Sequence, residues 1–165
     1  MKQFFTLFFC LLLAASAAGQ ELKPKQDASG KWGYVDAQGN IVISYQYDDT
    51  GNFYEDLAKV KLKDKWGFID KQGNMEIFFR YDDAKYFSEG LAAVQLNGTW
   101  GFVDSRGNTI IFFRYNGACS FSESLAAVQL NDIWGYIDKQ GAEVIPRLYD
   151  IAYSFSEGLA AVRLG

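Results

Sequence analysis

The amino-acid sequence predicts an all-β protein built from four tandem 34-residue repeats. Tryptophan recurs every 34 residues, each of these tryptophans is followed by glycine, and every repeat contains short apolar segments separated by turn residues. A fixed period of this length is typical of repeat architectures, in which neighbouring units share one core. The tryptophans, which we expect to form the repeat core, are Trp32, Trp66, Trp100 and Trp134.

Each repeat is predicted to contain three short antiparallel strands. In the second repeat the first strand starts at Trp66, and the second, 75–81, is rich in the Ile, Phe and Tyr side chains that suit a half-buried sheet. An irregular link, 82–88, leads to the third strand. That strand turns into the next Trp strand at Asn97-Gly98, a strong hairpin signal. Consecutive repeats are therefore expected to be joined by strand pairing.

The third strand of the first repeat predicts which side chains face inward. Successive side chains of a strand point to opposite faces of the sheet. Ala58, Val60 and Leu62 alternate with Lys59 and Lys61. We expect the apolar set to face the core and the lysines to face solvent.

A four-residue turn joins the first two strands of every repeat. Its first residue is Asp and its fourth is Gly, the pattern preferred by a type I turn whose glycine accepts a positive φ. The aspartates are also the most tempting metal ligands, but calcium needs about six to eight converging oxygens. No second acidic residue recurs beside them at a fixed spacing. We interpret the following residues as turn-forming: Asp36, Gly39, Asp70, Gly73, Asp104, Gly107, Asp138 and Gly141.

The array is predicted to be an open twisted β-solenoid, and the alternative is a small closed propeller-like array. Three strands in 34 residues are few for a propeller blade, where four strands and about 40 residues are usual. The segment before the first Trp strand is polar, and the last repeat stops where earlier ones turn into another Trp strand. Each end is therefore expected to offer an unpaired edge.

The N-terminus has the pattern of a secretory signal peptide. Lys2 is followed by the apolar run 4–13 and the small residues 14–19, with cleavage expected after Ala18 or Gly19. The apolar run is too short to span a bilayer as a helix. The expected organisation is a signal peptide over 1–19, a polar linker over 20–30, and repeats over 31–65, 66–99, 100–133 and 134–165. We expect a periplasmic or extracellular protein without a transmembrane span.

Composition disfavours several functions. The net charge is −4, and it becomes −5 when Lys2 is removed, so no basic stripe is available for nucleic acid. The sequence contains no histidine, which removes the common triads and zinc sites, and Cys119 is the one cysteine after the signal peptide. No phosphate-binding glycine loop opens a helix. We expect no catalytic residues, no cofactor and no metal site. The recurring glutamates are interpreted as turn or solvent residues: Glu55, Glu89, Glu123 and Glu157.

Three segments recur in order: W-G-[FY]-[IV]-D-x-x-G, an Ile-rich strand ending in Tyr-Asp, and F-S-E-G-L-A-x-V. Over 31–165 this pattern resembles the WG-repeat (WG-containing β-repeat) family of exported bacterial proteins. The departures are mild: Asn116 replaces the aspartate of Tyr-Asp, Asp56 and Ser124 replace a glycine, and Pro146 interrupts a second strand. The resemblance implies a repeat scaffold and no shared reaction.

We expect a non-catalytic scaffold that mediates protein–protein interaction at or outside the cell envelope. The alternative is a carbohydrate-binding or cell-wall-binding module, in which exposed aromatic rings stack on sugars or peptidoglycan. Positions that vary between repeats are the candidate contact surface: Lys59, Lys61, Lys85, Tyr86, Arg106 and Arg163.

Overall fold

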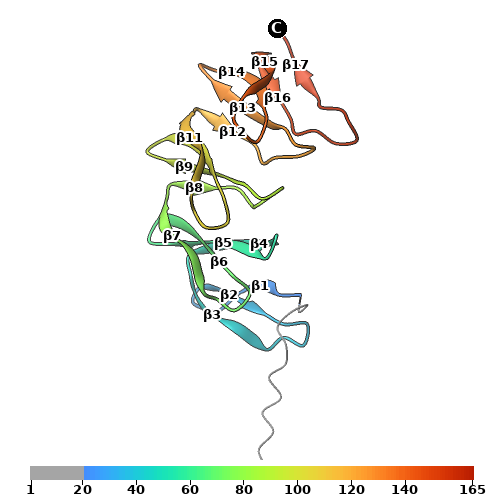
Figure 1. The fold of residues 1–165 in the computed structure, drawn as a ribbon. Helices are drawn as coiled ribbons and strands as arrows, with labels where there is room; N and C mark the ends of the chain where they lie inside the picture. The colour runs from blue at the N-terminus through green and yellow to red at the C-terminus, as the bar shows by residue number, and fades with distance from the viewer. Residues whose placement is uncertain (1–20) are drawn as a thin grey trace, which may run out of the picture.

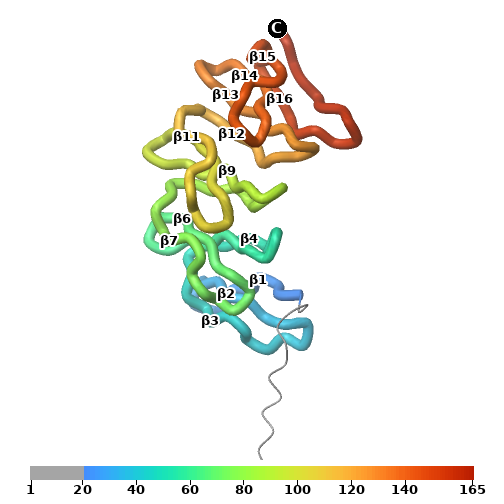
Figure 2. Tube along the Cα trace, viewed as in Figure 1, coloured from blue at the N-terminus to red at the C-terminus, as the bar shows by residue number. Residues whose placement is uncertain are grey.

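The computed structural model describes residues 21–165, so the predicted signal peptide lies outside the described part. The described chain forms strands and turns without a helix. Its sheets stack one on the next, from β1 at one end to β17 at the other (Figures 1 and 2). The two ends lie far apart, so the array is open, as predicted, and does not close into a propeller.

Four antiparallel sheets and a final strand pair make up the array. The first sheet has the strand order β1-β2-β3, and the next three have the orders β4-β5-β6-β7, β11-β10-β9-β8 and β12-β13-β14-β15. The last pair is β16-β17. The strands are β1 (Lys23–Gln26), β2 (Trp32–Val35), β3 (Ile41–Tyr47), β4 (Asp49–Tyr54), β5 (Leu57–Leu62), β6 (Lys65–Ile69), β7 (Met75–Tyr81), β8 (Asp83–Ala84), β9 (Ala92–Leu96), β10 (Thr99–Val103), β11 (Thr109–Tyr115), β12 (Gly117–Ala118), β13 (Ala126–Leu130), β14 (Ile133–Ile137), β15 (Glu143–Tyr149), β16 (Ile151–Ala152) and β17 (Val162–Arg163).

Each four-stranded sheet combines strands from two consecutive sequence repeats. In the second sheet, β4 and β5 belong to the first repeat, and β6 and β7 belong to the second. The hairpin between a third strand and the next Trp strand joins the repeats, as expected. A fourth strand in each repeat was not expected: the links contain β4, β8, β12 and β16, which pair with β5, β9, β13 and β17. Three of these strands, β8, β12 and β16, have two residues each, too few to show an alternating pattern.

β1 corrects two expectations about the N-terminus. The polar segment over 20–30 contains a strand, and this strand pairs with β2, so the first Trp strand is not an edge. A polar strand is stable here because only one of its faces meets another sheet. Leu22 is buried in the core between the first two sheets, whereas Lys23 and Lys25 are exposed. Terminal repeats of stacked arrays need such a polar outer face.

The core lies between the stacked sheets. Ala92 and Val94 of β9 pack toward the second sheet. Ala93 on the opposite face belongs to the core shared with the fourth sheet. An interior sheet is therefore covered on both faces. In β5, Ala58 and Val60 are fully buried, as predicted.

The glycine of each Trp-Gly pair is required by a bend in the second strand. Trp66 pairs with Tyr81 and Phe68 pairs with Ile77, so three residues of β7 span the single residue Gly67. A Cβ on Gly67 would lie 2.5 Å from the Ile77 carbonyl oxygen, closer than real Cβ atoms approach. The same carbonyl approach, at 2.4, 2.7 and 2.7 Å, occurs at Gly33, Gly101 and Gly135.

Candidate functional site

The four tryptophans lie at equivalent places but are buried to different degrees. Trp66 belongs to the core between the second and third sheets, and Trp100 belongs to the next core. Both are buried, whereas Trp32 and Trp134 are half-buried. The tryptophans near the two ends therefore keep part of their rings accessible.

Two predicted contact residues, Lys59 and Lys85, hold their ammonium groups over indoles. The Lys59 Nζ lies 4.3 Å from the Trp66 ring centroid, and the Lys85 Nζ lies 5.4 Å from that of Trp100. Lys59 also donates a hydrogen bond of 2.8 Å to a backbone carbonyl of the next sheet, and burial lowers its pKa. The prediction that Lys59 faces solvent is therefore wrong. Its stem lies against Gly51, where the missing Cβ leaves room.

The other predicted contact residues do not gather into one surface. Tyr86 stacks on Tyr54 of β4, with ring centroids 4.5 Å apart and an interplanar angle of 27°. Lys61 is half-buried in β5 and forms an ion pair of 3.6 Å with a neighbouring aspartate. Arg106 lies in the β10–β11 turn, and Arg163 lies in β17.

The turn aspartates direct their carboxylates into their own turns. Asp36 Oδ1 accepts hydrogen bonds from the amides of Gln38 and Asn40, and Oδ2 accepts one from the Asn40 side chain. The Asn40 side chain is the main cause that lowers the pKa of Asp36. Gly39, at φ 86°, donates its amide to the Asp36 carbonyl. The amide contacts recur at Asp70, Asp104 and Asp138.

The recurring glutamates link consecutive repeats, a role that the sequence analysis missed. The two carboxylate oxygens of Glu89 accept hydrogen bonds of 3.0 and 3.1 Å from the Ser124 amide, 35 residues further on. Glu89 also forms an ion pair of 3.0 Å with Lys139. Burial opposes ionisation of Glu89, but these contacts outweigh it and lower its pKa. Equivalent links join Glu55 to the Gly90 amide and Glu123 to the Gly158 amide. The constant 35-residue offset to a Gly or Ser is the signal that could have indicated this ladder.

Exposed apolar side chains concentrate on the second strands of the repeats. Phe78 of β7 and Phe112 of β11 are 76% and 77% exposed, and they occupy the same repeat position. These second strands form one edge of each of the four larger sheets. We call this surface the apolar ridge; its residues are Ile41, Val42, Phe78, Ile110, Phe112, Val144 and Leu148.

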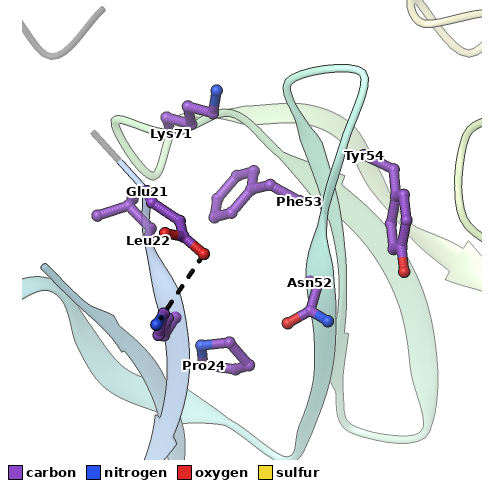
Figure 3. Close-up of a pocket in the computed structure, with 8 residues that line it drawn as sticks. Glu21, Leu22, Pro24, Asn52, Phe53, Tyr54 and Lys71 are labelled. Atoms are coloured by element: carbon purple, nitrogen blue, oxygen red, sulfur yellow. Dashed lines mark ion pairs between the residues drawn. The ribbon is translucent and has the colours of Figure 1, made fainter. Parts of the chain in front are cut away.

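A groove with a volume of about 690 Å³ lies on the other side of the array, between β1 and β4. The Pro24 ring and the Phe53 ring both project into it (Figure 3). Asn52 also lines the groove, and Lys71 closes one end. The groove is therefore an open, mixed polar and apolar cleft.

The described residues, 21–165, contain no group of three or more His, Cys, Asp or Glu side chains placed to hold a metal ion. Cys119 is a free, half-buried thiol, and burial raises its pKa. The same part of the chain has no helix long and apolar enough to cross a membrane.

Comparison with known proteins finds one family. The family model described as the WG containing repeat matches residues 32–66, 66–100, 100–132 and 134–165. No curated protein and no solved structure matches the chain. The four matches cover most of the chain, and they coincide with the Trp-Gly strands and bent second strands described above. The chain therefore belongs to the family of WG containing repeat proteins.

Proposed function

We propose that this chain is a non-catalytic, exported repeat scaffold that binds another protein through the apolar ridge, in the periplasm or outside the cell. The observation that carries the proposal is the exposure of Phe78 and Phe112, each about three-quarters accessible. Burying an exposed Phe side chain contributes about 1.5–3 kcal/mol. Two such rings at matching positions of neighbouring repeats supply a substantial part of the free energy of an interface.

Two arginines beside the rings support the proposal because their guanidinium groups are already fixed. Arg80 donates to the Tyr81 hydroxyl at 2.7 Å and to the Gly107 carbonyl of the next turn at 2.9 Å. Arg114 repeats this arrangement one unit later. A side chain that is ordered before binding loses less entropy on association. Aromatic residues and arginine are also enriched in protein interfaces.

The ridge is tested with the double variant Phe78→Ala/Phe112→Ala. Cross-linking of the exported chain to envelope proteins is expected to give one stoichiometric partner, and the double variant should reduce its capture at least tenfold. Ser44→Ala is the matched control, because Ser44 is exposed at the equivalent position of the first repeat. Circular dichroism should show an unchanged fold in both variants. Equal capture by the double variant would contradict the proposal.

The second candidate is a carbohydrate-binding or cell-wall-binding module, which the stacked pair Tyr54 and Tyr86 favours. These rings are 44% and 45% exposed and form a platform of the kind that sugars stack on. Retention of the protein on peptidoglycan or a polysaccharide column is the test. Loss of retention in Tyr54→Ala/Tyr86→Ala, with retention kept in the ridge variant, would favour this candidate over the scaffold.

A further inference from the structure

The outer edge of β1 lacks a strand that each of the next three sheets has. In those sheets the third strand lies between a Trp strand and a strand of the link, which is β4 or the shorter β8 or β12. In the first sheet β1 is the outermost strand, and within residues 21–165 no strand pairs with its outer edge. The groove between β1 and β4 lies at this position (Figure 3). The fold therefore repeats one strand position three times and leaves its first instance open.

The occupied positions show what an added strand would contact. The amide of Lys85 donates to the Ala93 carbonyl at 2.8 Å, and the amide of Asp82 donates to the Gln95 carbonyl at 2.9 Å. The fourth sheet repeats both bonds, from Cys119 to Ala127 and from Asn116 to Gln129, at 2.9 Å each. In the third and fourth sheets the segment that contains the short strand thus donates two amides, three residues apart, to carbonyls of the third strand.

Strand register identifies the equivalent carbonyls in β1. In the third sheet, Ala93 pairs with Phe102 of β10, and Gln95 pairs with Trp100 of the same strand. In β1 the residues paired with Tyr34 and Trp32 are Pro24 and Gln26. The acceptors are therefore the carbonyls of Pro24 and Gln26.

Pro24 determines which strands this edge accepts. Proline has no amide hydrogen, so it fits an edge position and leaves an acceptor there without a donor. The two bonds described above need only acceptors, so a strand that donates both amides can add. A second β1 is a poor partner, because it would bring its own proline and the exposed Lys23 and Lys25 against the same residues.

Trp32 indicates the side chain that an added strand would carry. In the second and third sheets a lysine ammonium lies over the equivalent indole, from Lys59 and Lys85. The β1 residue that matches Lys59 is Pro24, which brings no charge. Trp32 is half-buried, and no cation lies over its ring within residues 21–165. A strand with lysine at the position of Lys85 would place an ammonium there.

We propose that a short extended segment of a partner protein, carrying a lysine, adds to the outer edge of β1 as the fourth strand of the first sheet. Its two backbone amides bond the Pro24 and Gln26 carbonyls, and its ammonium covers Trp32. This inference rests on the proposed protein-binding function and adds a second contact, because β4 and the ridge strand β7 are opposite edges of a sheet.

The test uses a synthetic peptide with the sequence of residues 82–87, which fills this position in the third sheet, added to the exported chain. NMR titration should show saturable shifts of the Trp32 indole signal. N-methylation of the amide that corresponds to Lys85 removes one hydrogen bond and should weaken binding about tenfold. Exchange of the peptide's lysine for glutamine should weaken binding severalfold. Equal binding of the N-methylated peptide would overturn the proposal.

Protein variants separate the groove from the ridge. Asn52→Tyr places a ring in the groove, because Asn52 and Tyr86 occupy the same repeat position, and it should weaken peptide binding at least fivefold. Ser154→Tyr, at the same position of the last repeat, is the matched control and should bind normally. Saturation of the groove by an oligosaccharide with no peptide binding would overturn this inference. If only the peptide fails while the ridge still captures its partner, this inference is wrong and the proposed function stands.

Discussion

Gly67→Ala is the sharpest test of why glycine follows every repeat tryptophan. The new Cβ would lie 2.5 Å from the Ile77 carbonyl oxygen and 3.0 Å from the Phe79 amide nitrogen. Both atoms belong to backbone, which cannot rotate away as a side chain can, so β7 must move from β6. Overpacking of this kind costs about 1–3 kcal/mol, and we expect about 3 kcal/mol here. With an m-value of about 2 kcal/mol/M, the urea midpoint should fall by about 1.5 M.

Gly51→Ala is the matched control in the same sheet. Its Cβ would meet only the side chain of Lys59, with Cγ at 3.3 Å and Cε at 3.4 Å, and that stem can shift. We expect a change below about 0.5 kcal/mol, or about 0.25 M in urea. Urea unfolding followed by far-UV circular dichroism measures both variants. If Gly67→Ala unfolds within about 0.5 kcal/mol of the parent chain, the close approach of β7 does not explain the glycine.

Three further predictions follow from the core and the glutamate ladder. Trp100→Ala should lower the free energy of unfolding by about 3–5 kcal/mol, because the ring is buried between two sheets; a urea-midpoint loss equivalent to less than about 1 kcal/mol would contradict this. Glu89→Gln removes the charged acceptor of the Ser124 amide and should cost about 1 kcal/mol by thermal unfolding, whereas Glu157→Gln, for which the described chain shows no such contact, should leave the melting temperature unchanged. Because the pKa of Glu89 lies below its ordinary 4.5 in the folded chain, its stabilisation is present above about pH 4.5 and is lost as the pH falls through the lowered value. A pH series should therefore show a flat melting temperature from about pH 8 to 5.5, because the chain has no histidine to titrate in that range. The melting temperature should fall at acid pH, and this fall should be shallower in Glu89→Gln.

The features that the sequence predicted are those with a repeated local pattern. The Trp-Gly period, the Asp-x-x-Gly turns and the alternation at Ala58 and Val60 each depend on a few neighbouring residues, so the open all-β array could be predicted. β8, β12 and β16 could not, because two residues carry no alternation. β1 was missed because its lysines are typical of a linker, and its inward residue, Leu22, precedes the strand.

Contacts between repeats were harder to predict than the strands themselves. The alternation along β5 predicted that Lys59 faces solvent. That prediction is wrong because an interior sheet is covered on both faces, which the alternation along one strand does not indicate. The bonds from Glu89 and Arg80 to the next repeat depend on how sheets stack. The groove beside β1 exists because no strand of the described chain pairs with the outer edge of β1. It could be found only once the strand pairing was known.

The offset between sheets and sequence repeats decides where the chain divides into interchangeable modules. A cut before Trp100 separates β8 and β9 from β10 and β11, so it splits one sheet in half. A cut after Tyr81 or Tyr115 falls between complete sheets. Shortened or lengthened versions joined at the tyrosines should therefore fold as regular arrays, and versions joined at the tryptophans must rebuild a sheet from two different halves.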